Sequence, residues 1–225
     1  MWILVILLIG LSIFYAEYFV RRDRKLLETV TKTYRGTRSE RNMVLKLLKH
    51  GIPAKAIFHD LYVGHNGQYS QIDLVVAANV GILVIEVKDY SGWLFGKGNQ
   101  KQWTQVLAYG KEKYRFYNPV RQNNGHIMAL RKQSRQFAKL PFYSIIVFYG
   151  DCELKDVSFI PESTFITYSN GFLNTVDNII TNNKPAKFTD KWEVINVLTQ
   201  AVKNGENNEI QFQHSENIRN IKDRK

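Results

Sequence analysis

The chain has 225 residues, of which 44% are hydrophobic, and its formal net charge at pH 7 is +11. This length is enough for one sizeable domain with additional segments, and the apolar fraction is ordinary for a globular protein. The excess of basic residues favours a polyanionic partner, either nucleic acid or an anionic membrane surface. The single cysteine, Cys152, excludes an intramolecular disulfide and a cysteine-based zinc cluster.

The chain begins with an apolar segment, residues 2–20, whose only charged side chain is Glu17. A helix of this length spans roughly 28 Å, just enough to cross the hydrocarbon core of a membrane. A cleaved signal peptide is the competing interpretation, but the segment lacks the basic start and small-residue cleavage site of such peptides. Basic residues follow directly, so we expect a single-pass anchor in the cell membrane, with the N-terminus outside and the C-terminal domain in the cytoplasm.

The next two segments are expected to be helical. Residues 21–35 are polar and predict a basic linker helix beside the membrane. Residues 37–50 have the period of an amphipathic helix, with Thr37 or Ser39 as its N-cap. Glu40 lies on the apolar stripe of this helix, which makes it a candidate ligand or positioning group. A first-turn glutamate stabilised by the helix dipole would explain the same pattern without any function.

Residues 71–88 contain two aliphatic runs around a two-residue break, which is typical of a hairpin buried on both faces. In this register Asp73 lies opposite Glu86 on one face. Lys88 shares that face, with Gln71 across from it. Two carboxylates this close repel each other unless a cation lies between them, and a hard divalent ion with oxygen ligands is the expected cation. A structural ion pair at a strand end would explain the same spacing.

The segment after the hairpin, residues 89–103, predicts an extension of the second strand followed by a glycine-rich turn. Its aromatic residues are expected to pack inside the protein rather than to stack on bases: Trp93, Phe95 and Trp103.

A helix is expected to start at Asn118 and Pro119, which suit the N-cap and the first helical position. Gln122 and His126 lie one turn apart on this helix and could reach a phosphate or a metal-bound water. Arg121 belongs to a basic flank suited to a nucleic-acid backbone. A solvated helix face would explain these polar residues equally well.

The remainder of the chain indicates an α/β arrangement. Residues 142–149 and 157–167 predict strands, and the helix before them has the length of a crossover connection. Residues 171–181 and 190–203 predict two further helices. Residues 204–225 are polar and lack apolar periodicity, so we expect a frayed tail.

Taken in order, these residues resemble the NERD (nuclease-related) domain family, which is placed with the restriction-endonuclease-like PD-(D/E)XK fold. The resemblance runs from Gly36 to about Phe148. It rests on Gly36, Glu40, Gln71-Ile72-Asp73, Glu86-Val87-Lys88, Gly92, Trp103, Asn118-Pro119, Gln122 and His126. One departure is Ser39, where the family often has glycine before the helix glutamate.

The resemblance implies an α/β fold with a mixed central sheet flanked by helices and the site at the open end of the hairpin. It implies that Asp73 and Glu86 hold Mg²⁺ or Mn²⁺, with the backbone carbonyl of Val87 as a further ligand. Lys88 would act on the attacking water, and Gln71 would orient the lysine or the water. We therefore divide the chain into a transmembrane anchor (1–20), a linker helix (21–35), a nuclease-like domain (36–155), a C-terminal strand and helices packed on that domain (156–203) and a polar tail (204–225).

The resulting hypothesis is a membrane-anchored, metal-dependent nuclease that hydrolyses phosphodiester bonds of nucleic acid, with DNA as the expected substrate. A catalytically silent nucleic-acid-binding module at the membrane is the alternative. A membrane-associated structural protein would leave the clustered carboxylates unexplained. The histidines lack the spacing of zinc ligands, and the chain lacks the nucleophile elbow of a triad hydrolase.

Overall fold

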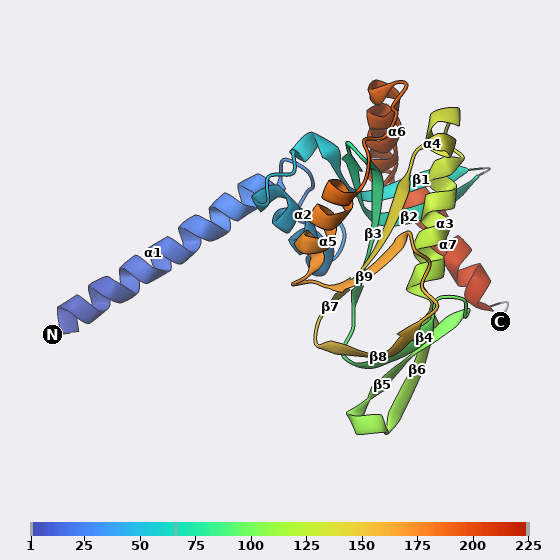
Figure 1. Ribbon diagram of the computed structural model, residues 1–225. Coiled ribbons are helices and arrows are strands. Elements are labelled where there is room, and N and C mark those ends of the chain that lie inside the picture. Colours follow the sequence, from blue (N-terminus) through green and yellow to red (C-terminus); the bar gives the residue numbers. More distant parts are fainter. Residues whose placement is uncertain (1, 66, 224–225) are drawn as a thin grey trace.

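The computed structural model describes residues 2–65 and 67–223, which form a mixed α/β fold with two sheets (Figure 1). The first sheet has the strand order β1-β2-β3-β7-β9. β1, β2 and β3 are antiparallel neighbours, whereas β7 and β9 run parallel to β3. The bounds are Ile57–His65 for β1, Gln68–Ala78 for β2, Gly81–Asp89 for β3, Phe142–Tyr149 for β7 and Thr164–Tyr168 for β9.

The second sheet has the order β6-β5-β4-β8. Its strands are β4 (Gly92–Lys97), β5 (Gln102–Leu107), β6 (Glu112–Tyr117) and β8 (Cys152–Ser158). The prediction of one central sheet was therefore incomplete. Gly92 adopts a φ of +75°, a left-handed conformation that glycine tolerates, and β4 begins there as a strand of another sheet. The strand predicted over residues 157–167 is likewise divided, because Pro161 lies in the connection between β8 and β9.

Helices cover both faces of the first sheet and bury two apolar clusters. On one face, α2 (Arg38–Lys49) and α5 (Phe172–Asn182) contribute side chains such as Leu47 and Val176. On the other face, α3 (Pro119–Arg131), α4 (Arg135–Lys139) and α6 (Lys191–Asn204) contribute Leu130, Phe137 and Leu198. These apolar faces explain why strands β2 and β3 are buried on both sides.

Both helix starts predicted near the site are confirmed. The Thr37 hydroxyl accepts a hydrogen bond from the Glu40 amide at the start of α2, and the Asn118 side chain accepts one from Val120 at the start of α3. The hairpin is also confirmed, because Ala78 pairs with Gly81 across its turn. α3 belongs to the crossover connection from β3 to its parallel neighbour β7, which also contains β4, β5, β6 and α4.

The N-terminal helix, α1 (Trp2–Leu27), extends away from the two sheets (Figure 1). In the part of the chain that the structure describes, no helix combines the length and apolar character needed to cross a membrane, so the predicted anchor over residues 2–20 is not supported. α1 continues to Leu27, so residues 21–27 of the predicted linker are helical as part of α1, whereas residues 28–35 are turns and irregular structure. The cell-membrane location depended on that anchor and stays a prediction.

The C-terminal segment is helical, which corrects the prediction of a frayed tail over residues 204–225. α7 (Asn208–Asp223) packs beside β2, where His214 Nδ1 lies 2.8 Å from the carbonyl oxygen of Tyr69. The His214 ring also contacts Tyr62 edge-to-face. Polar side chains make these contacts, and a sequence interpretation that looks for apolar packing does not anticipate them.

Candidate active site

The open end of the hairpin contains a local reversal of side-chain alternation in β1 and β2. Phe58 and Leu61, three residues apart, lie in the same apolar cluster, and so do Ile72 and Val75. In a regular strand, residues three apart point to opposite faces. The reversal occurs at Asp60, whose φ of +55° is left-handed, and in β2 at the position opposite it in the register.

That opposite position in β2 is Asp73, whose half-buried side chain turns toward β3. The β2–β3 ladder ends at the pair Leu74 and Ile85. Beyond it, Asp73 Oδ2 accepts a hydrogen bond of 2.8 Å from the backbone amide of Val87. The carboxylate thus replaces a main-chain carbonyl where the two strands separate, which holds Asp73 beside the residues that flank Val87.

Glu86 is 1% exposed and lies between two nitrogen-bearing side chains. Its Oε1 is 2.6 Å from Lys88 Nζ, and its Oε2 is 3.1 Å from His126 Nε2. An ionised carboxylate can only accept hydrogen bonds, so Nε2 of the imidazole is the donor. In the neutral imidazole, Nδ1 then accepts from the Ser70 hydroxyl at 2.8 Å. Three elements, β2, β3 and α3, therefore fix the position of Glu86.

Four charged side chains perturb one another's ionisation, and we call them the carboxylate cluster: Asp73, Glu86, Lys88 and Glu40. Burial raises the pKa of Asp73 well above its usual value, and the negative charges of Glu86 and Glu40 raise it further. Burial also opposes ionisation of Glu86, but the hydrogen bond from His126 and the charge of Lys88 outweigh burial and lower its pKa. For Lys88, burial favours the neutral amine, yet the adjacent carboxylates outweigh it and raise the pKa. In this cluster Glu86 is ionised and Lys88 is charged, whereas the ionised form of Asp73 is disfavoured.

Glu40 lies on α2 and is buried, as its position on the apolar stripe predicted. Its Oε1 accepts a 2.7 Å hydrogen bond from the Thr37 hydroxyl, and its Oε2 lies 3.4 Å from Nε2 of His59. The latter contact is longer than an ordinary hydrogen bond, and both atoms lack a hydrogen-bond partner within the described residues. Burial opposes the ionisation of Glu40, but His59 and Thr37 outweigh it and lower its pKa.

Among the described residues, the Gln71 side chain forms no hydrogen bond with Lys88, and its predicted role of orienting the lysine or the water stays a prediction. Its Nε2 donates a 3.0 Å hydrogen bond to Asp60 Oδ1 on the neighbouring strand β1. Asp60 Oδ2 accepts from Nε of Arg35 at 3.0 Å, and the Arg35 side chain is 5% exposed. The reason for the difference is the reversed alternation at Asp60 and Asp73, which directs Gln71 away from the carboxylate cluster.

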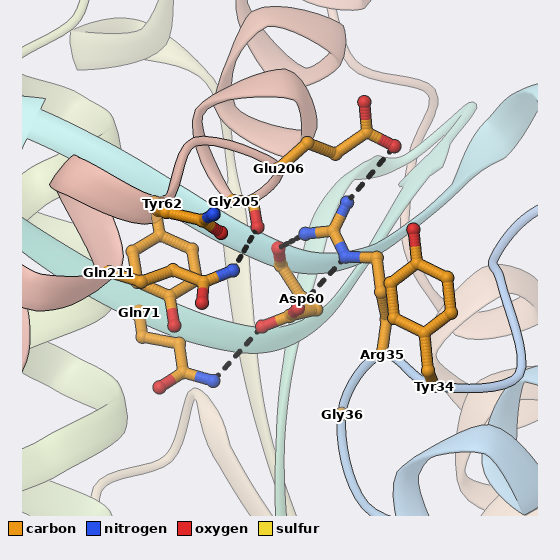
Figure 2. Close-up of a pocket in the computed structure, with 10 residues that line it drawn as sticks. Tyr34, Arg35, Gly36, Asp60, Tyr62, Gln71, Gly205, Glu206 and Gln211 are labelled. Atoms are coloured by element: carbon orange, nitrogen blue, oxygen red, sulfur yellow. Dashed lines mark hydrogen bonds and ion pairs between the residues drawn. The ribbon is translucent and has the colours of Figure 1, made fainter.

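These three residues border a cavity of about 400 Å³ that α7 and the turn before it close from the other side (Figure 2). Figure 2 shows Arg35 between Asp60 and Glu206, with Gln71 on the opposite side of Asp60. The cavity lies near Glu40, because Gly36 lines it and a Cβ added to Gly36 would lie 2.5 Å from Glu40 Oε2.

The remaining predicted residues differ in placement. His126 reaches the cluster through Glu86. Gln122 is half-buried one turn before it, and its side chain makes no hydrogen bond among the described residues. Arg121 is exposed at the start of α3.

Several residues of this region were missed by sequence reasoning. Ser70 fixes His126, His59 contacts Glu40, and Asp60 links Gln71 to Arg35. The available signal was the presence of two polar residues, His59 and Asp60, inside an apolar strand, since buried polar side chains require partners.

The donors fit a divalent cation by charge and chemistry. Mg²⁺ binds through a few carboxylate or carbonyl oxygens and retains waters, which matches Asp73, Glu86 and the carbonyl of Val87. The raised pKa of Asp73 indicates that its negative charge is disfavoured at this position, and a bound cation would offset that charge. Within the described residues, no three His, Cys, Asp or Glu side chains gather as a metal site, so an ion here would depend on backbone and water oxygens.

Residues 35–149, just over half of the chain, match the family described as nuclease-related domain (NERD). The chain belongs to this family. The nuclease-related domain begins at Arg35 and ends with β7, so it contains every residue of the carboxylate cluster. The second sheet is included except for β8, and α5, α6 and α7 lie outside.

The nuclease-related domain also has a relative in Bacillus anthracis, a protein described as uncharacterized, with 33% identity over 124 residues. The matched region covers 52% of this chain and 57% of that protein, so the chain spans little more than half of its relative. No solved structure matched the chain.

Proposed function

We propose that this chain is a metal-dependent nuclease that hydrolyses phosphodiester bonds of nucleic acid, with DNA as the substrate. The observation that carries the proposal is the cluster of Asp73, Glu86 and Lys88 at the open end of the hairpin. Burial and the charge of Glu86 raise the pKa of Asp73, and the charged Lys88 lies beside Glu86. Such a group is suited to bind a cation and a phosphate. Membership of the nuclease-related family and the net charge of +11 agree with a polyanionic substrate.

Asp73, Glu86 and the carbonyl of Val87 would hold Mg²⁺ or Mn²⁺. When bound, the ion would polarise a phosphoryl oxygen and lower the pKa of a bound water. The protein residues have separate tasks. Lys88 places a positive charge where negative charge develops on the phosphoryl group and holds the attacking water. Asp73 is fixed for its task by the Val87 amide.

His126 positions Glu86 rather than touching the reacting atoms. Its hydrogen bond fixes Glu86 Oε2, and Ser70 fixes the imidazole in turn. Glu40 contributes a buried negative charge that strengthens the attraction of the site for a cation. Arg121 and Gln122 lie on the first turn of the same helix, where they would contact substrate phosphates.

A catalytically silent nucleic-acid-binding module is the second candidate. It is favoured by one observation: both oxygens of Glu86 already have nitrogen partners, Lys88 and His126. Such an arrangement would also serve as a buried structural ion pair. The two candidates differ in whether phosphodiester bonds are broken, so cleavage is the property to measure.

The test uses the full chain and the variants Glu86→Gln and Lys88→Ala. A matched control is Glu162→Gln, which changes an exposed glutamate outside the nuclease-related domain. Each protein is incubated with plasmid, single-stranded DNA or RNA, in Mg²⁺, Mn²⁺ or chelator. We expect metal-dependent cleavage by wild type and control, and a loss on the order of 10²–10³-fold in each site variant. Unchanged cleavage by Glu86→Gln, or binding without cleavage in every metal, would contradict the proposal.

A further inference from the structure

The second sheet has one face that packs on the protein interior. Leu94 of β4, Trp103 of β5 and Phe116 of β6 belong to an apolar cluster with Ile146 and Phe148 of β7. Trp103 stacks on Phe148 with ring centroids 6.1 Å apart. Because side chains alternate along a strand, the neighbours of these residues must point to the opposite face.

The opposite face combines aromatic and basic side chains in rows across three strands. One row contains Trp93, Val106 and Lys113, and the next contains Phe95, Thr104 and Arg115. In a third row, Tyr117 lies beside Gln102. Successive rows are two residues apart, or roughly 6.6 Å along the strands. We call this face, defined by Trp93, Phe95, Lys113, Arg115 and Tyr117, the aromatic–basic face.

Its side chains are accessible. Tyr117 is 45% exposed, Lys113 and Arg115 are exposed, and Trp93 and Phe95 are half-buried. In Figure 1 the β5–β6 hairpin projects beyond the rest of the molecule. The prediction that the aromatic residues of this segment pack inside is confirmed for Trp103 but holds only in part for the other two.

The two edges of the sheet differ in charge. At the β8 edge, the exposed acidic residues Glu153 and Asp156 lie beside Trp93 and Phe95. Within the described residues, Lys113 and Arg115 form no ion pair, whereas at the opposite edge Lys155 pairs with Glu153 and also covers the Trp93 ring at 5.5 Å. Lys155 therefore occupies one face of the Trp93 ring through a cation–π contact. Positive charge that lacks a protein partner is thus concentrated on β6, next to Tyr117.

The aromatic–basic face is rigidly joined to the carboxylate cluster. β4 follows β3 after a short turn, and the Tyr90 ring in that turn packs against Phe116 of β6, with ring centroids 4.6 Å apart and planes tilted by 43°. β6 leads directly into α3, which carries His126. Between them, the Asn118 side chain donates hydrogen bonds to three carbonyl groups of the β4–β5 turn, those of Lys97, Gly98 and Gln100.

We propose that the aromatic–basic face binds single-stranded nucleic acid, whose bases stack on Tyr117 and Phe95 while Lys113 and Arg115 neutralise phosphates. Stacking on exposed rings requires unpaired bases, and interleaved cations follow the backbone. A duplex offers its phosphates but not its base faces, so this surface discriminates in favour of single strands. The inference deepens the proposed function, because it assigns the strandedness of the nucleic acid that reaches the carboxylate cluster.

The test measures binding of the full chain to a labelled oligothymidylate and to a labelled duplex of equal length, with chelator present to prevent cleavage. The variants are Tyr117→Ala and the pair Lys113→Gln/Arg115→Gln. Matched controls on α6 are Trp192→Ala, at a residue 76% exposed, and the pair Lys191→Gln/Lys203→Gln, both exposed. Thermal melting verifies that each variant is folded.

We expect Tyr117→Ala to weaken oligothymidylate binding about 5- to 150-fold, with a much smaller effect on the duplex. The lysine–arginine pair should reduce the slope of log affinity against log salt by about 1.4 for the single strand. The α6 controls should bind as wild type does. Equal losses on single strand and duplex, or variants that bind like the controls, would overturn the proposal, as would a wild type that binds neither probe.

The outcome is separable from that of the nuclease proposal. Binding in chelator does not require catalysis, and cleavage is judged with Glu86→Gln. Loss of cleavage in Glu86→Gln together with wild-type binding by Tyr117→Ala rejects the aromatic–basic face and retains the nuclease. The reverse pattern rejects the nuclease and retains the binding face.

Discussion

Asp73 accepts a 2.8 Å hydrogen bond from the backbone amide of Val87, where the β2–β3 ladder has already ended. A side chain thereby takes the place of a main-chain acceptor at the point where two strands diverge. The bond favours the ionised carboxylate, whereas burial and the charges of Glu86 and Glu40 disfavour it, and the latter effects prevail. The site is therefore under electrostatic strain that a cation would relieve.

This strain predicts that Asp73→Asn stabilises the metal-free protein. The amide oxygen of asparagine can still accept from Val87 but has no charge, so the repulsion from Glu86 and Glu40 is removed. A carboxyl whose folded-state pKa is raised loses stability as the pH rises from its unfolded pKa to its folded pKa. The two proteins should therefore unfold alike at a pH below the ordinary pKa of aspartate, and the variant should be more stable at neutral pH.

Denaturant titration in chelator at a series of pH values measures this difference, with Asp156→Asn as an exposed control. Added Mg²⁺ or Mn²⁺ should stabilise wild type but not Asp73→Asn, because binding to the folded state alone raises stability. A variant less stable than wild type at neutral pH would show that the Val87 bond outweighs the repulsion.

His126 should act as a positioning residue. His126→Ala removes the hydrogen bond to Glu86 Oε2, and we expect activity or metal affinity to fall about 10- to 100-fold. His126→Gln can donate to the same oxygen, so it should retain part of the activity that His126→Ala loses. Its pH–rate profile should contain no ionisation from this residue. If glutamine and alanine lower activity equally, and the wild-type profile contains an ionisation that both lack, the imidazole itself transfers protons.

Arg35 and Asp60 form a buried ion pair that supports the left-handed turn of β1 at Asp60. Arg35→Ala leaves the carboxylate buried without its partner, so we expect a loss of about 3–5 kcal/mol in unfolding free energy. Arg38→Ala, at an exposed residue, should change stability little. A similar small change in unfolding free energy in both variants, measured by denaturant titration, would show that the hydrogen bond from Gln71 alone stabilises the buried Asp60 carboxylate.

Gly36 is required by two separate constraints. Its φ is +61°, and an added Cβ would lie 2.5 Å from Glu40 Oε2 and 2.6 Å from Nε2 of His59. Gly36→Ala should therefore destabilise the protein by more than the roughly 1–2 kcal/mol cost of a left-handed alanine, and should lower activity by displacing Glu40. Gly51→Ala is the matched control, because Gly51 is also left-handed, at φ +94°, but has open space around it. Equal effects of the two substitutions on stability and activity would contradict a close-packing role.

Local patterns predicted the elements nearest the site. The caps at Thr37 and Asn118, the hairpin turn at Ala78 and Gly81, and the bounds of β7 follow from contacts within a few residues along the chain. The second sheet and α7 were not predicted, because strand pairing between β4 and β8 and the polar packing of α7 on β2 join distant segments.

The short hairpin turn, which is readable in the sequence, brings Asp73 to the same end of the hairpin as Glu86 and Lys88. What holds these three side chains in place depends on contacts with distant parts of the chain. Ser70 reaches His126 only because the alternation of β2 reverses at Asp73, and that reversal is matched by the left-handed Asp60, which Arg35 secures from outside the sheet. Alternation is a local rule, whereas its reversal depends on partners that lie far away in the chain.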